Sequence, residues 1–97
     1  MAKGYWIVSV EMYDAEEYKK YQQAVRPFLA SKGAVFLTRG GAHEVVEGEA
    51  NSRNVIIEFE SYEQALAVYR SDEYQALIPL RRNGSTSNFI IVEGFDS

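Results

Sequence analysis

Apolar side chains recur at every second position in several short segments of this chain, which is the pattern of strands with one covered face. In residues 5–12, one face is entirely apolar, whereas the other face mixes apolar and polar side chains. Gly40 and Gly41 are a strong turn signal between two such segments. Residues 48–54 and 83–88 are polar and small, so they are predicted to be loops. The segments predicted to be strands are residues 5–12, 35–39, 43–47, 55–60 and 89–95.

A first helix is predicted after Asp14, which forms a capping box with Glu17 three residues later. Tyrosines and apolar side chains then recur at helical spacing. Pro27 lies inside this helix and removes one backbone donor, so we expect a kink or a break near residues 23–26. Gly33 supplies the left-handed residue that ends the helix.

Further helices are predicted between the strand at residues 55–60 and the last strand. Ser61 and Gln64 form a second capping box. Ser71 begins another helix, with two acidic residues in its first turn, where the helix dipole favours them. Pro79 is expected to divide the end of this helix into two pieces. The predicted order is therefore strand, helix, three strands, helices and strand.

This order predicts an α+β fold, an antiparallel sheet with its helices on one face, because right-handed crossovers return to the same side. Residues 1–97 are expected to form a single domain, since the chain has the length of one small domain. The other sheet face is expected to keep a large apolar surface, which a second copy of the chain would cover. The residues expected on this open face are Tyr5, Ile7, Ile56, Phe89, Ile91 and Phe95.

Composition excludes several classes of function. The net charge of −4 and the scattered basic residues argue against a nucleic-acid partner, because no face collects a basic stripe. The chain has no cysteine and one histidine, so we expect no thiolate chemistry, no metal and no cofactor. No apolar run is long enough to cross a bilayer, and no secretory signal is visible. We therefore expect no membrane partner and a cytoplasmic location.

A set of short motifs is distributed over essentially the whole chain. The motifs are Gly4-Tyr5-Trp6, residues 36–41, Val46-Glu47-Gly48, Ile57-Glu58-Phe59, Tyr69-Arg70-Ser71, Glu73-Tyr74-Gln75, Arg81 and Val92-Glu93-Gly94. Together they resemble the family known as domain of unknown function 1330. The resemblance implies a ferredoxin-like sandwich and a homodimer of the dimeric α+β barrel type. It implies no established reaction, because the family is named for the lack of one.

The first candidate for ligand binding is Arg39, which ends an apolar strand beside Gly40 and Gly41. Adjacent glycines let a ligand approach the backbone closely. The guanidinium suits a two-pronged contact with a carboxylate or a phosphate. The alternative is that Arg39 forms an ion pair with Glu58 or Glu93 on a neighbouring strand, and the two interpretations are compatible.

A second candidate group combines cations with phenols near the ends of two consecutive helices. Such a mixture suits a small anionic or aromatic ligand. The alternative is that its tyrosines lie at the edge of the core and that one arginine complements a helix end. The members of this group are Tyr69, Arg70, Tyr74 and Arg81.

Two residues are candidates for catalytic proton transfer. Glu93 lies on a mixed strand face, where a buried carboxylate must be paired or have a raised pKa. His43 is the one side chain whose ordinary pKa lies near neutrality. These observations favour binding of a small anionic or aromatic metabolite, and leave open whether the protein is a cofactor-free enzyme. The alternative is a non-catalytic dimeric accessory or interaction protein.

Overall fold

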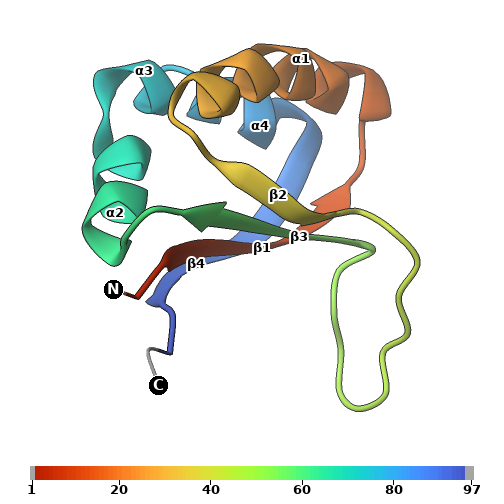
Figure 1. Cartoon of the computed structure of the whole chain (residues 1–97). Helices are drawn as coiled ribbons and strands as arrows, with labels where there is room; N and C mark the ends of the chain where they lie inside the picture. The colour runs from red at the N-terminus through yellow and green to blue at the C-terminus, as the bar shows by residue number, and fades with distance from the viewer. Residues whose placement is uncertain (1, 96–97) are drawn as a thin grey trace.

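The computed structural model describes residues 2–95, and within them a four-stranded antiparallel sheet lies beneath a layer of helices (Figure 1). The strand order across the sheet is β2-β3-β1-β4, which is the ferredoxin-like arrangement and confirms the predicted fold class. The strands are Gly4–Met12 (β1), Val35–Arg39 (β2), Arg53–Phe59 (β3) and Ser85–Glu93 (β4). The helices are Ala15–Ser31 (α1), Tyr62–Arg70 (α2), Asp72–Gln75 (α3) and Ile78–Gly84 (α4).

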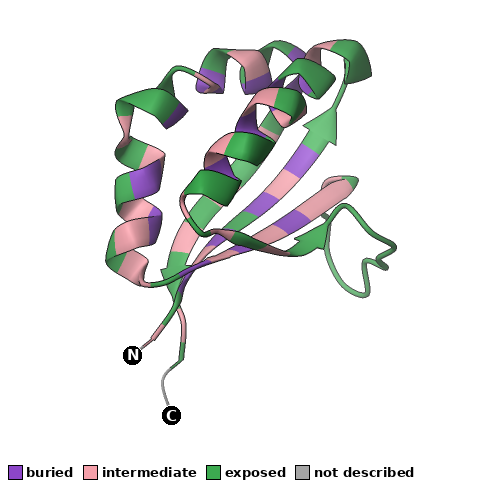
Figure 2. Cartoon of the chain, turned by 45° about the horizontal axis from the view of Figure 1, so that its top comes forward, coloured by how far each residue is buried: buried purple, intermediate pink, exposed green. Residues whose placement is uncertain are grey.

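The core lies between the helices and one face of the sheet, where buried residues gather (Figure 2). Alternation along β1 places Trp6, Val8 and Val10 in this core, with at most 7 % of each residue exposed. The Trp6 ring lies 4.8 Å from that of Phe59 and 4.9 Å from that of Tyr74. Trp6 therefore joins the central strand to β3 and to the helical layer.

Helix α1 begins where the sequence predicts, because the Asp14 carboxylate accepts a hydrogen bond from the backbone of Glu17. Gly33 follows the helix with a φ of +73°, also as predicted. The predicted break near residues 23–26 is wrong, since α1 is continuous through Pro27, whereas the alternative of a kink stays a prediction. Gln23 and Pro27 are exposed, so they lie on the side of α1 away from the core, where water can satisfy the carbonyl that loses its donor.

Two other predictions about helices and loops differ from the structure for local reasons. The helix predicted after Ser71 is in two pieces, α3 and α4, but these are separated at residues 76–77 and not within residues 77–82. Pro79 lies in the first turn of α4, where a missing N–H is tolerated. The predicted loop at 83–88 is the end of α4 and the start of β4. The Ser85 hydroxyl caps α4 by donating to the Arg81 carbonyl, and the polar residues that follow pair through their backbones with β1.

The predicted strand at residues 43–47 is also wrong, because the whole segment from 40 to 52 is a loop. Its apolar residues, Val45 and Val46, are neighbours, so a strand would turn one of them to each face. In the loop both remain exposed, Val46 by 82 %.

The open face of the sheet differs from the prediction along β4. Phe89 lies opposite Val8 in the register and packs on the helix side of the sheet. Ile91, two residues further along β4, lies opposite Trp6 and packs on the same side. Ile90 and Val92 therefore occupy the open face instead. Tyr5, Ile7 and Ile56 lie there as predicted, whereas Phe95 lies beyond the end of β4. Among the helices of residues 2–95, none combines the length and the apolar character needed to span a membrane.

Candidate functional site

A cavity of about 40 Å³ lies between α1 and the sheet. This volume accommodates roughly two or three water molecules. Its floor and much of its wall are apolar, from valine, isoleucine, phenylalanine and tryptophan side chains. Four arginines from four different elements complete the lining: Arg26 of α1, Arg39 of β2, Arg53 of β3 and Arg81 of α4.

The charge around this cavity is opposite in sign to that of the protein. The chain has a net charge of −4, yet four of its six arginines and no aspartate or glutamate line the cavity. Within residues 2–95, none of these four arginines forms an ion pair with a carboxylate. The arrangement therefore offers positive charge without an internal counter-ion, which favours an anion in the cavity.

Arg81 is the most buried of the four arginines, with 5 % of the residue exposed. Its Nη1 donates to the Tyr74 hydroxyl at 2.8 Å, and that hydroxyl lies 2.8 Å from the Tyr21 hydroxyl. Its guanidinium carbon lies 5.1 Å from the centre of the Phe89 ring. The Arg81 Nε is buried and has no hydrogen-bond partner in the described structure. An unmade hydrogen bond to a buried charged group costs about 1–3 kcal/mol or more, so an acceptor from a ligand would be favourable there.

Arg53 begins β3 and shares the covered face because it lies two positions before Val55. Its guanidinium carbon lies 5.9 Å from the centre of the Tyr18 ring. Gly40, with a φ of +74°, makes room for this guanidinium, because a Cβ at that position would collide with it. In the described part of the chain, the Arg53 Nε is the second buried donor that lacks a partner.

Arg39 belongs to the cavity because of an irregularity in β2. Phe36 lies opposite Ile57 and Thr38 lies opposite Ile56, so β2 carries one extra residue between these pairs. Such a bulge shifts the alternation of faces by one residue. Phe36 and Arg39 therefore share the face towards α1, and the Arg39 guanidinium lies 5.4 Å from the Phe36 ring centre. Arg39 is exposed, as is Arg26, so these two arginines form the mouth of the cavity.

Three phenols around the arginines are held in their neutral form. Burial raises the pKa of Tyr18, Tyr21 and Tyr74, most strongly for Tyr21, where the neighbouring Tyr74 adds to the effect. The charges of Arg53 and Arg81 partly oppose this rise in the pKa of Tyr18. Burial lowers the pKa of Arg81, but the phenols beside it raise that pKa by more, so the guanidinium stays charged. The phenols can therefore donate hydrogen bonds at neutral pH.

These raised pKa values predict a loss of stability at high pH. A phenol whose pKa is higher in the folded than in the unfolded protein contributes stability that is complete below about pH 10 and is lost above it. We expect the free energy of unfolding to fall above about pH 10, and the fall to be smaller in Tyr21→Phe. Urea unfolding followed by circular dichroism across this range measures the slope.

The control for this prediction is Tyr13→Phe, since Tyr13 is 65 % exposed. Its slope above about pH 10 should equal that of the unchanged protein. Ultraviolet absorbance of the phenolate supplies a second readout. If all seven tyrosines titrated together near pH 10 without loss of structure, the buried network would be contradicted.

The structure brings three of the candidates from the sequence together. Arg39 and Arg81 line one cavity, and Tyr74 accepts a hydrogen bond from Arg81. The Tyr69 ring lies 5.4 Å from that of Tyr74 but does not line the cavity, and Arg70 is exposed at the end of α2.

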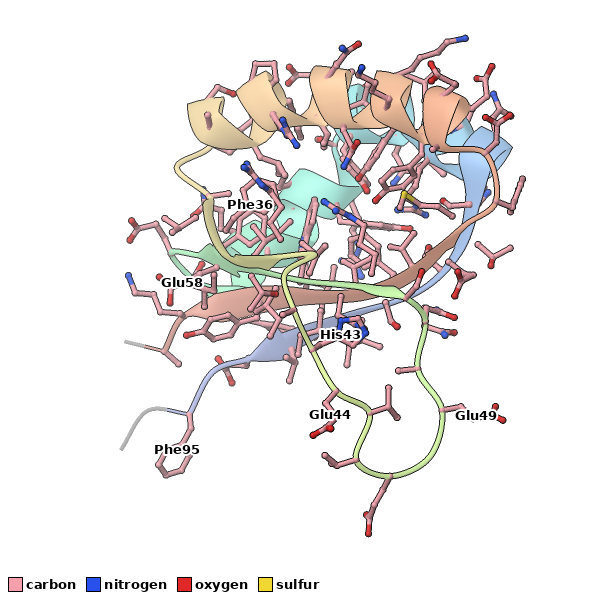
Figure 3. All side chains as sticks on the ribbon, turned by 90° about the vertical axis from the view of Figure 1, so that its right-hand side faces the viewer. Phe36, His43, Glu44, Glu49, Glu58 and Phe95 are labelled. Atoms are coloured by element: carbon pink, nitrogen blue, oxygen red, sulfur yellow. The ribbon has the colours of Figure 1, made fainter. Side chains whose placement is uncertain are left out.

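The two candidates for proton transfer lie elsewhere. His43 is exposed in the loop below the sheet, with its Nδ1 3.3 Å from the Gly41 carbonyl, while Phe36 lies above the sheet towards α1 (Figure 3). Glu93 is exposed at the end of β4, opposite Gly4. Neither residue lines the cavity, and their catalytic role stays a prediction. Gly41 lines a groove on the open face together with His43.

The alternative partners of Arg39 make other contacts. Within residues 2–95, Arg39 forms no ion pair with Glu58 or Glu93. Glu58 instead accepts a hydrogen bond from the Tyr5 hydroxyl at 3.1 Å, and this bond is the main cause of a raised pKa of Tyr5. Arg39 is therefore available to a ligand.

Arg53 and Arg26 are cavity residues that the sequence analysis did not single out. Arg53 was predicted to lie in a loop. Extending the alternation of buried residues in β3 from Val55 back by two residues would have placed Arg53 on the covered face. Arg26 follows Gln22 by one helical turn, and both line the cavity. Nothing in the spacing along the chain indicated that arginines so far apart would meet. As for metals, residues 2–95 contain no group of three His, Cys, Asp or Glu side chains placed to bind one.

Comparison with known proteins identifies the fold but does not identify a reaction. The family model described as domain of unknown function DUF1330 matches residues 3–95. A protein of unknown function from Rhodopseudomonas palustris is similar in structure, with a TM-score of 0.77, 15 % identity, and 99 % of this chain and 85 % of that chain covered. SnoaB, a cofactor-independent oxygenase from Streptomyces nogalater, has a TM-score of 0.67 and 11 % identity, with 100 % of this chain and 97 % of that chain covered.

A third similar structure is a dimeric protein of unknown function with a ferredoxin-like fold from Bacteroides fragilis. Its TM-score is 0.54 and its identity 14 %, with 94 % of this chain and 95 % of that chain covered. No match was found among curated protein sequences. At such low identities the structural similarity establishes the fold alone.

Proposed function

The chain belongs to the DUF1330 family, and we propose that it binds a small anionic metabolite in the cavity between α1 and the sheet. The observation that carries this proposal is the meeting of four arginines around one cavity, with no carboxylate of residues 2–95 in its lining. Among these described residues, two of the arginines keep a buried Nε donor without a partner. Buried polar groups are normally satisfied, so such donors support a site for an acceptor.

The ligand has an anionic group and an apolar part. Arg53 and Arg81 supply donors inside the cavity, whereas Arg26 and Arg39 stand at its mouth. The apolar floor favours an aliphatic or aromatic portion, since burying unpaired hydroxyl groups is unfavourable. Because the cavity is only about 40 Å³, the exposed side chains at the mouth must move outwards when the ligand enters.

A reaction without a cofactor would be an extension of this binding. SnoaB supports the extension only at the level of the fold, and fold similarity does not transfer a reaction. The neutral phenols of Tyr18 and Tyr21 line the cavity and can donate to an oxyanion. We therefore propose ligand binding as the function. Catalytic turnover is to be tested only with ligands that have first been shown to bind.

A thermal-shift screen of small carboxylates and phosphates tests the proposal. A ligand at a hundred times its Kd adds about 2.7 kcal/mol, which raises the Tm of a domain of this size by on the order of 10 °C. In Arg39→Ala we expect the affinity to fall about 10-fold to 100-fold, because one charge-assisted hydrogen bond contributes about 1.5–3 kcal/mol.

The control is Arg82→Ala, which removes an exposed arginine that does not line the cavity and should leave the affinity unchanged. If no carboxylate or phosphate shifts the Tm at millimolar concentration, anion binding is rejected. The non-catalytic accessory protein then becomes the favoured function. An equal loss in Arg39→Ala and Arg82→Ala would also reject the cavity as the site.

We also propose that the chain forms a homodimer through the open face of the sheet. A row of isoleucines crosses this face, because Ile7 lies opposite both Ile56 and Ile90. Ile90 is 58 % exposed and Ile7 37 %, which leaves an apolar surface uncovered. The loop of residues 40–52 and Phe95 both extend on this side of the sheet (Figure 3), where they can flank a second copy. The Bacteroides fragilis protein with this fold is dimeric.

Analytical ultracentrifugation tests the dimer. We expect the unchanged protein to sediment as a dimer. Ile90→Lys should raise the Kd of dimerisation by about 30-fold or more, because a loss of about 2 kcal/mol is expected for a substitution at the centre of an interface. Gln23→Lys, on the exposed side of α1, adds the same charge away from the sheet and should leave the dimer intact. A monomeric unchanged protein would reject the dimer.

A further inference from the structure

We infer that the ligand of this cavity is a dianion, with two anionic groups separated by an apolar spacer. This inference rests on the proposed function and specifies its ligand. It is derived from the distribution of the arginines over the length of the cavity. The proposal of anion binding does not depend on this distribution.

The floor of the cavity contains one transverse row of the sheet with a guanidinium near each end. Arg39 lies opposite Val55, Val55 opposite Val8, and Val8 opposite Phe89. The Arg81 guanidinium lies over the Phe89 ring, at 5.1 Å from its centre. Three interstrand spacings, roughly 14 Å, separate the backbones of β2 and β4. Val55 and Val8 therefore lie between Arg39 at one end of the row and Arg81, which lies over Phe89, at the other end.

The end of the cavity at Arg81 fits one anionic group. Within residues 2–95, the Arg81 Nε is buried and lacks a hydrogen-bond partner. Arg81 is 95 % buried, since 5 % of it is exposed, and its Nη1 is held by Tyr74. Its Nε can therefore donate a charge-assisted hydrogen bond to one carboxylate.

The outer end fits a second anionic group. Arg26 and Arg39 are exposed at the mouth and, within residues 2–95, neither forms an ion pair with a carboxylate. The Arg53 guanidinium lies against Gly40, next to Arg39, and within residues 2–95 its Nε is buried without a partner, so a monoanion bound at Arg81 would leave this donor unpaired. A second carboxylate at the far end of an apolar spacer reaches the arginines at this end without placing a polar group on the valines between.

Paired ligands that differ in one carboxylate test this inference by calorimetry. Terephthalate and 4-methylbenzoate share a ring and one carboxylate, and adipate and hexanoate form a flexible pair. We expect each dianion to bind at least 10-fold more tightly than its partner. In Arg39→Ala this advantage should shrink to less than threefold, whereas Arg81→Met should weaken both members of a pair by a similar factor.

Each outcome separates the inference from the proposal beneath it. If both members of each pair bind equally and both lose affinity in Arg81→Met, the dianion is rejected but anion binding in the cavity stands. If neither member binds, the proposed function fails as well. Circular dichroism verifies the fold of each variant, and Arg81→Gln replaces Arg81→Met if the latter does not fold. Arg82→Ala should reproduce the unchanged affinities for all four ligands.

Discussion

Replacing Trp6 by alanine is expected to lower the free energy of unfolding by about 3–5 kcal/mol. Trp6 is 1 % exposed, and its ring lies 5.1 Å from that of Phe89, in addition to its contacts with β3 and α3. Its Nε1 donates to the Ala65 carbonyl of α2 at 2.9 Å. The substitution therefore leaves a cavity in the core and removes this additional hydrogen bond to α2, and both effects destabilise the fold.

Urea unfolding measures this loss, followed by circular dichroism because Trp6 is the single tryptophan of the chain. A domain of this size has a total stability of about 5–15 kcal/mol, so Trp6→Ala will be near the limit of folding. Trp6→Phe keeps an aromatic ring and should lose less. Val46→Ala, at a position 82 % exposed, should change the stability by less than about 0.5 kcal/mol. A loss below about 1 kcal/mol in Trp6→Ala would contradict the central position of this side chain.

The second large effect is expected at Arg81, where stability and binding should change in opposite directions. Arg81→Met is expected to raise the free energy of unfolding of the ligand-free protein by about 1 kcal/mol or more, since replacing buried ion pairs by apolar residues of similar volume is neutral or stabilising by about 1–4 kcal/mol. The same substitution should weaken anion binding at least 10-fold.

The physical reason is that Arg81 is buried without a carboxylate partner among the described residues and keeps one unpaired donor. Removing it relieves this cost, while Tyr74 and Tyr21 keep the hydrogen bond between their hydroxyls. Methionine fills most of the space, so little cavity is created. The binding loss follows because the inner donor for the ligand is gone.

Unfolding by urea and calorimetric titration with terephthalate check the two halves of this prediction. Arg82→Met, at the neighbouring exposed position, should change neither quantity appreciably. A loss of stability of more than about 1 kcal/mol in Arg81→Met would show that this guanidinium supports the fold through Tyr74. In that case the buried charge would need no ligand to explain it.

A buried cation that costs stability is understandable if it has a function. Most proteins have room for stabilising substitutions at binding sites, since function and stability place different demands on the same residue. Arg53 shows the same combination, because within residues 2–95 its Nε is also buried without a partner. These two unpaired donors therefore support the proposal that the cavity is a binding site.

The local pattern of the sequence determined most of the fold. Alternation placed Trp6 and Val8 on the covered face, and the capping residues Asp14 and Ser61 marked the starts of α1 and α2. These features depend on residues within a few positions of one another, and right-handed crossovers then leave few ways to arrange the elements. The polar start of β4 was not predictable in this way, because its pairing uses backbone groups that all residues share.

The sequence also indicated part of the candidate site, since Arg39, Tyr74 and Arg81 were singled out before their positions were known. Only the tertiary structure brought Arg39 and Arg81 to one cavity and added Arg26 and Arg53. The bulge in β2 decided which face Arg39 occupies, and sheet pairing decided its distance from β4. Such relations join residues far apart in the chain, and the packing of the helices on the sheet sets them, so no periodicity along the sequence records them.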